Sequence, residues 1–281
     1  MTTKIIQFPK TICLGDLYVH DGTSNPPQLI PAKGPVTVPS GSIVTLNVRL
    51  NDKLKFRNLQ WLQPDDIDIL VIDSIELNDK SLSVLKHLSG LKSLTIRNDP
   101  VCYGSFLKEF VRDVRLSKLC LDNTMVNDRQ TAYLSTLQTQ LKALAITRSI
   151  YVKDQILETL AFYRGGILDL SDTGLTGLAV FGEQFGTGLR ALSMARTRIS
   201  DGTLRSLHAD QKSHLEYLDI SYTPITGEGI QHLGTIPTLK YLNVAGTRLD
   251  SQALARVSSQ FPQLETLHTT DMATQSPNGC K

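Results

Sequence analysis

The sequence lacks the features of a membrane-spanning protein and of a strongly charged one. It contains no apolar run of about 18 residues, the length that a membrane helix requires. Its 29 basic and 27 acidic residues leave a net charge of only +2, without a dense basic cluster. This balance disfavours nucleic acid and anionic membranes as partners. Residues 1–9 show no apolar segment typical of a secretory signal, so we expect a cytoplasmic protein.

Motifs that carry chemistry are also missing. The four cysteines, which lie at positions 13, 102, 120 and 280, form no CxxC pair, so we expect reduced thiols and no zinc site. The six histidines are dispersed. No phosphate-binding glycine loop, nucleophile elbow or zinc-protease motif occurs. The sequence therefore predicts no catalytic residue, no metal and no cofactor, and a protein that is not an enzyme.

The sequence does contain a repeat with the pattern L-x-x-L-x-L-x-x-T-x-L. Two clear copies are residues 215–225 and 239–249, and the same frame extends through most of the chain at spacings of 24 to 26 residues. Such a period indicates stacked structural repeats. The ten copies begin at Ile43, Ile67, Leu91, Leu116, Leu141, Gly165, Leu189, Leu215, Leu239 and Leu264.

Each copy changes its apolar period part-way along. Positions 4 and 6 alternate with polar residues, which predicts a strand with one buried face. Later residues such as Leu82, Leu85 and Leu88 recur every third position, which predicts a short helix. One copy cannot bury its apolar side alone, so the copies must stack. We predict an α/β solenoid, a curved horseshoe with a parallel sheet on its concave side and short helices on its convex side.

Position 9 of the copies carries small polar side chains in most cases. A hydroxyl there can bond to the backbone where the chain leaves the sheet. We therefore predict hydroxyl-to-backbone hydrogen bonds from Thr173, Thr197, Thr223 and Thr247, whereas Ile75 interrupts the series.

These repeats resemble leucine-rich-repeat proteins over about residues 43–271. The stretches Thr197–Asp201 and Thr223–Gly227 are similar to bacterial arrays with 24-residue repeats, akin to the ribonuclease-inhibitor-like and cysteine-containing classes. Those classes place Asn or Cys at position 9, where this chain mostly has Thr. The resemblance implies a protein-interaction function without identifying the partner. We expect a monomer.

The ends of the chain depart from the repeat. We predict that residues 1–42 form a small β cap, with strands near 12–19 and 36–38 and a loop at 25–35, because a solenoid end needs covering. A separate ligand-binding domain is the alternative. Residues 43–271 form the array and residues 272–281 a flexible tail. Within the array we expect irregular structure at 165–188, a helix near 105–114 and a bulged loop at 208–212.

The candidate binding site lies on the strand positions that point away from the core, namely positions 3, 5 and 7. The C-terminal third is richest there in aromatic and polar residues, and Tyr and Arg are frequent interface anchors. A tyrosine pair that only stabilises the sheet is the alternative interpretation. The predicted partner-binding residues are Tyr217, Asp219, Tyr222, Tyr241, Asn243 and His268, rimmed by Arg196 and Arg248.

Three functional hypotheses follow from the sequence. The first is a scaffold that binds another protein on its concave face. The second is an adaptor or regulatory subunit of a signalling or ubiquitin-ligase assembly. The third is a small-ligand or enzymatic role carried by residues 1–42.

Overall fold

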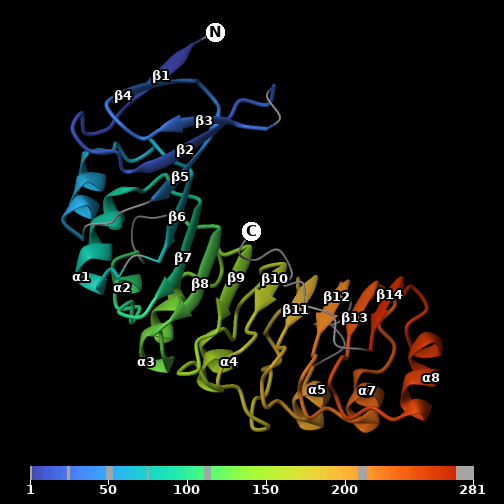
Figure 1. Cartoon of the computed structure of the whole chain (residues 1–281). Helices are drawn as coiled ribbons and strands as arrows, with labels where there is room; N and C mark the ends of the chain where they lie inside the picture. The colour runs from blue at the N-terminus through green and yellow to red at the C-terminus, as the bar shows by residue number, and fades with distance from the viewer. Residues whose placement is uncertain are drawn as a thin grey trace. The chain divides into compact units, whose positions relative to one another are not determined.

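The chain divides into two compact units, Met1–Met125 and Val126–Lys281 (Figure 1). The computed structural model describes residues 2–23, 26–48, 53–74, 76–110, 115–207 and 214–269, without the side chains of 53–56. The predicted bulged loop at 208–212 and the predicted tail at 272–281 lie outside the described residues.

The main sheet of the first unit is built from repeat strands that run parallel. They are β5 (Ile43–Val48), β6 (Ile69–Asp73), β7 (Ser93–Asp99) and β8 (Lys118–Thr124). Leu46, Leu70, Leu94 and Leu119, all at position 4, are aligned across these strands and have no exposed surface. The predicted register is therefore correct in this unit.

The N-terminal segment supplies strands that pair in the opposite sense. β2 (Gly15–His20) pairs antiparallel with β5 on one side and with β3 (Gln28–Pro31) on the other. β1 (Thr3–Gln7) and β4 (Pro35–Pro39) form a separate two-stranded sheet. The strands predicted near 12–19 and 36–38 correspond to β2 and β4, whereas β1 and β3 were not predicted. Pairing with β2 satisfies backbone groups that an edge strand would leave open.

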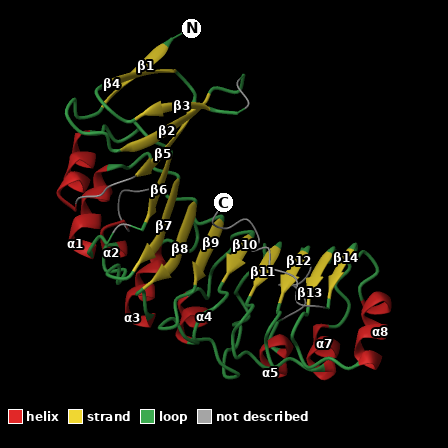
Figure 2. Cartoon of the chain, viewed as in Figure 1, coloured by secondary structure: helices red, strands yellow, loops and turns green. Residues whose placement is uncertain are grey.

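The sheet of the second unit consists of six parallel strands that follow one another in chain order (Figure 2). Position 4 again aligns from strand to strand, and Leu144, Leu168, Leu192, Leu218 and Leu242 are all 0% exposed. These leucines line one continuous interior. The strands are β9 (Ala143–Thr147), β10 (Ile167–Asp169), β11 (Ala191–Ser193), β12 (Tyr217–Asp219), β13 (Tyr241–Asn243) and β14 (Thr266–His268).

Where a copy has a helical part, that part is short, and several of these segments are 3₁₀ helix. Leu82, Leu85 and Leu88 are fully buried, which confirms the predicted helical stripe. The helix expected near 105–114 is seen as α2 (Leu107–Phe110), and residues 111–114 lie outside the described part. The other elements of the first unit are η1 (Lys53–Trp61), α1 (Asp79–Leu82) and η2 (Ser83–His87).

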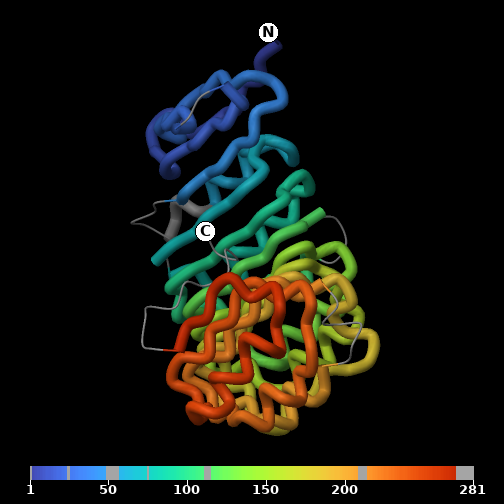
Figure 3. The backbone as a smooth tube through the Cα atoms, turned by 90° about the vertical axis from the view of Figure 1, so that its right-hand side faces the viewer, coloured from blue at the N-terminus to red at the C-terminus, as the bar shows by residue number. Residues whose placement is uncertain are grey.

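In the second unit, the helices lie on the opposite side of the coils from the strands (Figure 2), and Figure 3 shows these coils one behind another. Their buried residues again recur at helical spacing, as Ile230 and Leu233 show. The elements are α3 (Asp128–Thr131), η3 (Ala132–Thr136), α4 (Gln155–Thr159), α5 (Asp201–Arg205), α7 (Gly227–Leu233) and α8 (Ser251–Gln260).

The glycine-rich copy at 165–188 has no helix after its strand, as predicted. Aromatic side chains fill the space instead: the rings of Phe181 and Phe185 lie 4.8 Å apart, and those of Tyr163 and Phe185 6.4 Å apart. All three rings are buried. Burial of these rings supplies the apolar surface that a regular helix would otherwise contribute.

The four predicted threonine hydrogen bonds are present. Thr173, Thr197 and Thr247 each donate from Oγ1 to the carbonyl oxygen three residues earlier, at 2.6 Å. Thr223 does the same to Ile220. These bonds satisfy buried carbonyl groups where the chain leaves the sheet. Ile75 lies outside the described residues.

The residue before each of these positions adopts a left-handed backbone. The non-glycine members have φ between 52° and 56°, and Gly246 has φ 64°. Left-handed residues at this point turn these eight copies out of their strands in the same way. The members are Ser74, Asn98, Asn123, Arg148, Asp172, Arg196, Tyr222 and Gly246.

Aspartates on the convex side form hydrogen bonds between one copy and the next. Asp201 accepts hydrogen bonds from the backbone N–H and the hydroxyl of Thr226, at 2.9 and 2.6 Å. Asp154 accepts from the same two groups of Thr176. Asp79 and Asp128 accept hydrogen bonds from backbone N–H groups of the following copy. The Ser/Thr-Asp/Gly stretch seen in the sequence is thus a contact between copies.

The expectation of four reduced thiols is wrong at Cys120, which is disulfide-bonded, whereas Cys13 and Cys102 are free. Among the described residues, no helix has the length and apolar character needed to cross a membrane.

Candidate functional site

Three aromatic side chains lie in a row on the surface of the second unit's sheet, and two of them are stacked. The rings of Tyr217 and Tyr241 lie 4.3 Å apart and are nearly parallel, at 5°. The imidazole of His268 follows, with its centroid 5.1 Å from Tyr241. Tyr217 and Tyr241 are aligned on β12 and β13, and each ring is partly exposed. We call these three residues the aromatic stack.

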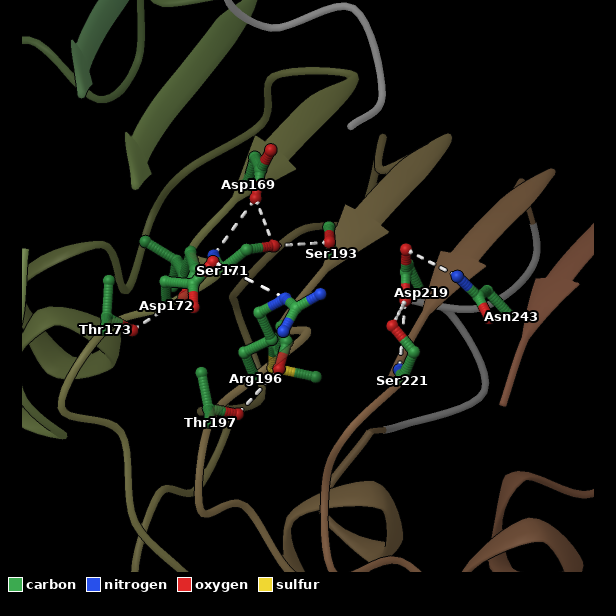
Figure 4. Close-up of polar contacts among 12 residues, drawn as sticks. Asp169, Ser171, Asp172, Thr173, Ser193, Arg196, Thr197, Asp219, Ser221 and Asn243 are labelled. Atoms are coloured by element: carbon green, nitrogen blue, oxygen red, sulfur yellow. Dashed lines mark hydrogen bonds and ion pairs between the residues drawn. The ribbon is translucent and has the colours of Figure 1, made fainter. Parts of the chain in front are cut away.

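A row of polar side chains lies beside the stack at positions 5 and 7 (Figure 4). The Asp219 carboxylate accepts from Ser221 Oγ at 2.7 Å and from Asn243 Nδ2 at 3.1 Å. Asp169 accepts from Ser171 Oγ at 2.6 Å, and that hydroxyl is also 2.6 Å from Ser193 Oγ. These bonds link β10 to β11 and β12 to β13. They hold the strands that carry the aromatic rings.

The sequence analysis placed Asp219 and Asn243 among exposed residues that contact a partner, and the structure corrects their placement. Their exposed fractions are only 1% and 2%. Side chains at position 5 are covered because parallel strands pack them closely against their neighbours, and their polar atoms bond to one another. In this conformation the two residues orient the surface, and their contact with a partner stays a prediction.

A second cluster forms where β11 and β12 end. The guanidinium of Arg196 lies 4.3 Å from the centre of the Tyr222 ring, a cation–π distance. Its Nε is 4.0 Å from Asp172 Oδ2. On the next copy, a Cβ on Gly246 would lie 2.6 Å from Tyr222 Cδ1, so glycine is required there for the ring to occupy this place. Arg196, Tyr222 and Gly246 make up what we call the strand-end cluster.

Arg248 lies apart from these two groups. It is exposed and follows the turn at Gly246, and its backbone N–H donates to Ile225 at 2.8 Å. Its role as a rim residue stays a prediction. Of the eight predicted site residues, three lie together in the aromatic stack and two in the strand-end cluster. Asp219 and Asn243 lie beside the stack.

Metal or acid–base chemistry finds little support in the described part of the chain, where no three His, Cys, Asp or Glu side chains are grouped as metal ligands. The buried carboxylates of Asp169 and Asp219 face serine and asparagine groups, as described above. This arrangement suits a structural role.

Comparison with known proteins places this geometry in a family context. The model of the leucine-rich-repeat family matches residues 211–234, the copy that carries Tyr217. An internalin, InlF from Listeria monocytogenes, has a similar structure, with a TM-score of 0.57 and 17% identity over 81% of this chain and 59% of that one. TLR13, solved in complex with ssRNA13, gives 0.52 and 17% over 83% and 37%. No curated protein matches. The chain has the leucine-rich-repeat fold.

The comparisons establish only the fold of this chain. Identities of 17% carry no information on its partners. The chain spans 59% of the internalin's length and 37% of that of TLR13. Its function has to be argued from its own surface.

Two features of the site in this leucine-rich-repeat protein were missed by sequence reasoning. The burial of position 5 was one, and the left-handed turn at position 8 was the other. A signal for the second existed, since Asn98, Asn123 and Gly246 belong to residue types that favour the left-handed region. The pattern was not recognisable in every copy, because the same position also holds Arg148, Arg196 and Tyr222, whose residue types rarely adopt that conformation.

The environment of the stack predicts an unusual alkaline titration. Burial, and next the nearby charge of Asp219, raise the pKa values of Tyr217 and Tyr241 above that of an ordinary tyrosine. As the pH rises above about 10, the unfolded chain loses these protons while the fold retains them, so stability decreases. We expect spectrophotometric titration of Tyr217→Phe to lose one late-titrating phenol. Loss of an early-titrating phenol instead would contradict this placement.

Proposed function

We propose that this leucine-rich-repeat protein is a monomeric, non-catalytic scaffold that binds another protein on the sheet surface of its second unit. The observation that carries the proposal is the aromatic stack, in which Tyr217 and Tyr241 are aligned on β12 and β13 and the ring of His268 lies diagonally from Tyr241 on β14. Rigid tyrosine rings supply large contact area at a low entropic cost. The strand-end cluster adds Arg196, a residue type that is enriched with tyrosine at binding hot spots.

The hydrogen bonds beside the stack support this proposal because they hold the rings in place before a partner binds. Asp219 is bonded to Ser221 and Asn243 within the sheet, and Tyr217 Oη lies 3.5 Å from its carboxylate. A partner would then meet rings that are already ordered, so less conformational entropy is lost on binding. The alternative, in which the stack only stabilises the sheet, predicts a change in stability without a change in binding.

The experiment compares the proteins that immobilised variants of the full chain retain from lysate of the source cells. The test variant is Tyr217→Ala with Tyr241→Ala, and the matched control is Tyr151→Ala, an exposed tyrosine outside the strands. Since hot-spot residues each contribute about 2 kcal/mol or more, we expect recovery of the partner to fall at least about 10-fold for the double variant only. Quantitative mass spectrometry measures the recovery.

Two further measurements make this experiment decisive. A stacked aromatic pair contributes about 0.5–1.5 kcal/mol, so the double variant should stay folded, which circular dichroism checks. Tyr217→Phe with Tyr241→Phe keeps the rings and should retain the partner. Equal retention of every protein by wild type and double alanine variant would refute the proposal. Single-stranded RNA, the ligand in the TLR13 complex, serves as a control for which we expect no binding.

The cellular compartment is a separate part of the proposal. The composition of residues 1–9 suggested the cytoplasm, whereas the disulfide at Cys120 is a bond that persists in oxidising compartments. Alkylation of the protein isolated from its source under non-reducing conditions decides between them. A blocked Cys120 thiol places the chain in an oxidising compartment, and an alkylated one places it in the cytoplasm.

A further inference from the structure

The first unit contains a pocket with no role in the proposed protein binding. It lies where the end of β1 and the residues after it meet η1, and its volume is about 360 Å³. That volume is within the range of small-molecule sites. The lining residues are Gln7, Phe8, Pro9, Asn58 and Trp61.

The single tryptophan of the chain forms one wall of this pocket. Trp61 is 63% exposed, whereas Phe8 beside it is 5% exposed. An indole exposed to this extent leaves a large apolar face in water, which is unfavourable unless a ligand covers it. The ring also presents one N–H donor.

The remaining lining chemistry is neutral and able to form hydrogen bonds. None of the five lining residues is ionisable. Gln7 and Asn58 each carry an amide that offers both a donor and an acceptor. Among the described residues, a charged ligand would find no opposite charge on these walls, so they favour a neutral ligand with an apolar face and several hydroxyl groups.

The backbone fixes one side of the pocket. Gln7 pairs with Pro35 of β4, the Phe8 N–H donates to Gly34 at 2.9 Å, and the Gly34 N–H donates to Pro9 at 3.0 Å. The segment Gln7–Pro9 is therefore held on both sides of Phe8. This side of the pocket is therefore preformed.

We propose that this pocket binds a neutral saccharide. One face of a pyranose ring presents C–H groups that pack on the Trp61 indole. Its hydroxyl groups both donate and accept, which matches the amides of Gln7 and Asn58. A proline-rich peptide is the competing occupant, but it uses successive aromatic-lined subsites. Here Trp61 is the one lining residue with an exposed aromatic ring among those that the structure describes.

Because the chain has one tryptophan, its emission reports directly on this pocket. The full chain is titrated with maltose, cellobiose, N,N′-diacetylchitobiose and, in parallel, hexaproline. We expect a saturable blue shift of the emission with at least one saccharide, half-complete at a saccharide concentration of about 1 mM. Loss of one hydrogen bond in Asn58→Ala or Gln7→Ala should weaken binding about 10-fold. Gln60→Ala, an exposed amide of η1 outside the lining, should leave it unchanged.

The proposal is overturned if no saccharide shifts the emission up to about 20 mM. A shift that persists undiminished in both amide variants, or one produced by hexaproline alone, would overturn it as well. The double tyrosine variant should bind the saccharide like wild type, so failure here is distinguishable from failure of the protein-binding proposal.

Discussion

Replacement of Leu218 by aspartate should unfold the second unit or destabilise it by at least about 4 kcal/mol. Leu218 has no exposed surface and is aligned between Leu192 and Leu242 on neighbouring strands. A carboxylate there would be buried among apolar side chains without a partner. Because each copy supports the next, the damage should spread to adjacent copies. Urea denaturation followed by circular dichroism measures the loss.

Leu178→Asp is the matched control. Leu178 is 83% exposed, so the same substitution should change stability by no more than about 0.5 kcal/mol. Similar stability of Leu218→Asp and wild type would mean that the strand register is wrong.

Replacement of Gly165 by alanine should lower the stability by about 3 kcal/mol or more, because the close packing at this residue has no room for a methyl group. A Cβ on Gly165 would lie 2.6 Å from the Leu141 carbonyl oxygen and closer still to Tyr163 Oη. Tyr163 is buried, and its hydroxyl donates to the Ile167 carbonyl. The ring cannot move without breaking that bond. Thermal unfolding should show the loss.

Gly182→Ala is the matched control in the same copy. A Cβ on Gly182 would have no atom within 4 Å. We expect this variant to melt at or slightly above the wild-type temperature, since alanine restricts the unfolded chain. If both variants melted alike, the close contact between Gly165 and Tyr163 would not exist in solution.

The repeat strands could be predicted from the sequence because burial at positions 4 and 6 depends on a local period. Leu144 and Leu218 lie where the period placed them. The threonine bonds were predictable for the same reason, since Thr173 and Thr247 reach a carbonyl only three residues away. Patterns that depend on neighbours in sequence were therefore sufficient for the fold.

Features that depend on neighbours in space were not predictable. Asp219 alternates with buried residues and was expected to be exposed, but adjacent strands cover it. The strand β3 (Gln28–Pro31) follows two prolines in a segment that was expected to be a loop, and its pairing with β2 overrides that local tendency. The disulfide of Cys120 was missed for the same reason.

The candidate site was predicted in part. The spacing of 24 residues between Tyr217 and Tyr241 was enough to predict contact, and the rings are stacked. His268 reaches Tyr241 diagonally, because the register places it opposite Asn243 on the next strand. The packing of Tyr222 between Arg196 and Gly246 could not be foreseen, because it depends on left-handed turns at residue types that rarely form them.

Hydroxyl-radical footprinting of the native complex tests the central claim most directly. If a partner binds the sheet surface, mass spectrometry should find Tyr217, Tyr241 and His268 protected from oxidation in the complex relative to the free chain. Tyr151 and Phe162, exposed outside the strands, should be oxidised equally in both states. Protection of Tyr151 and Phe162 with an unprotected stack would contradict the account.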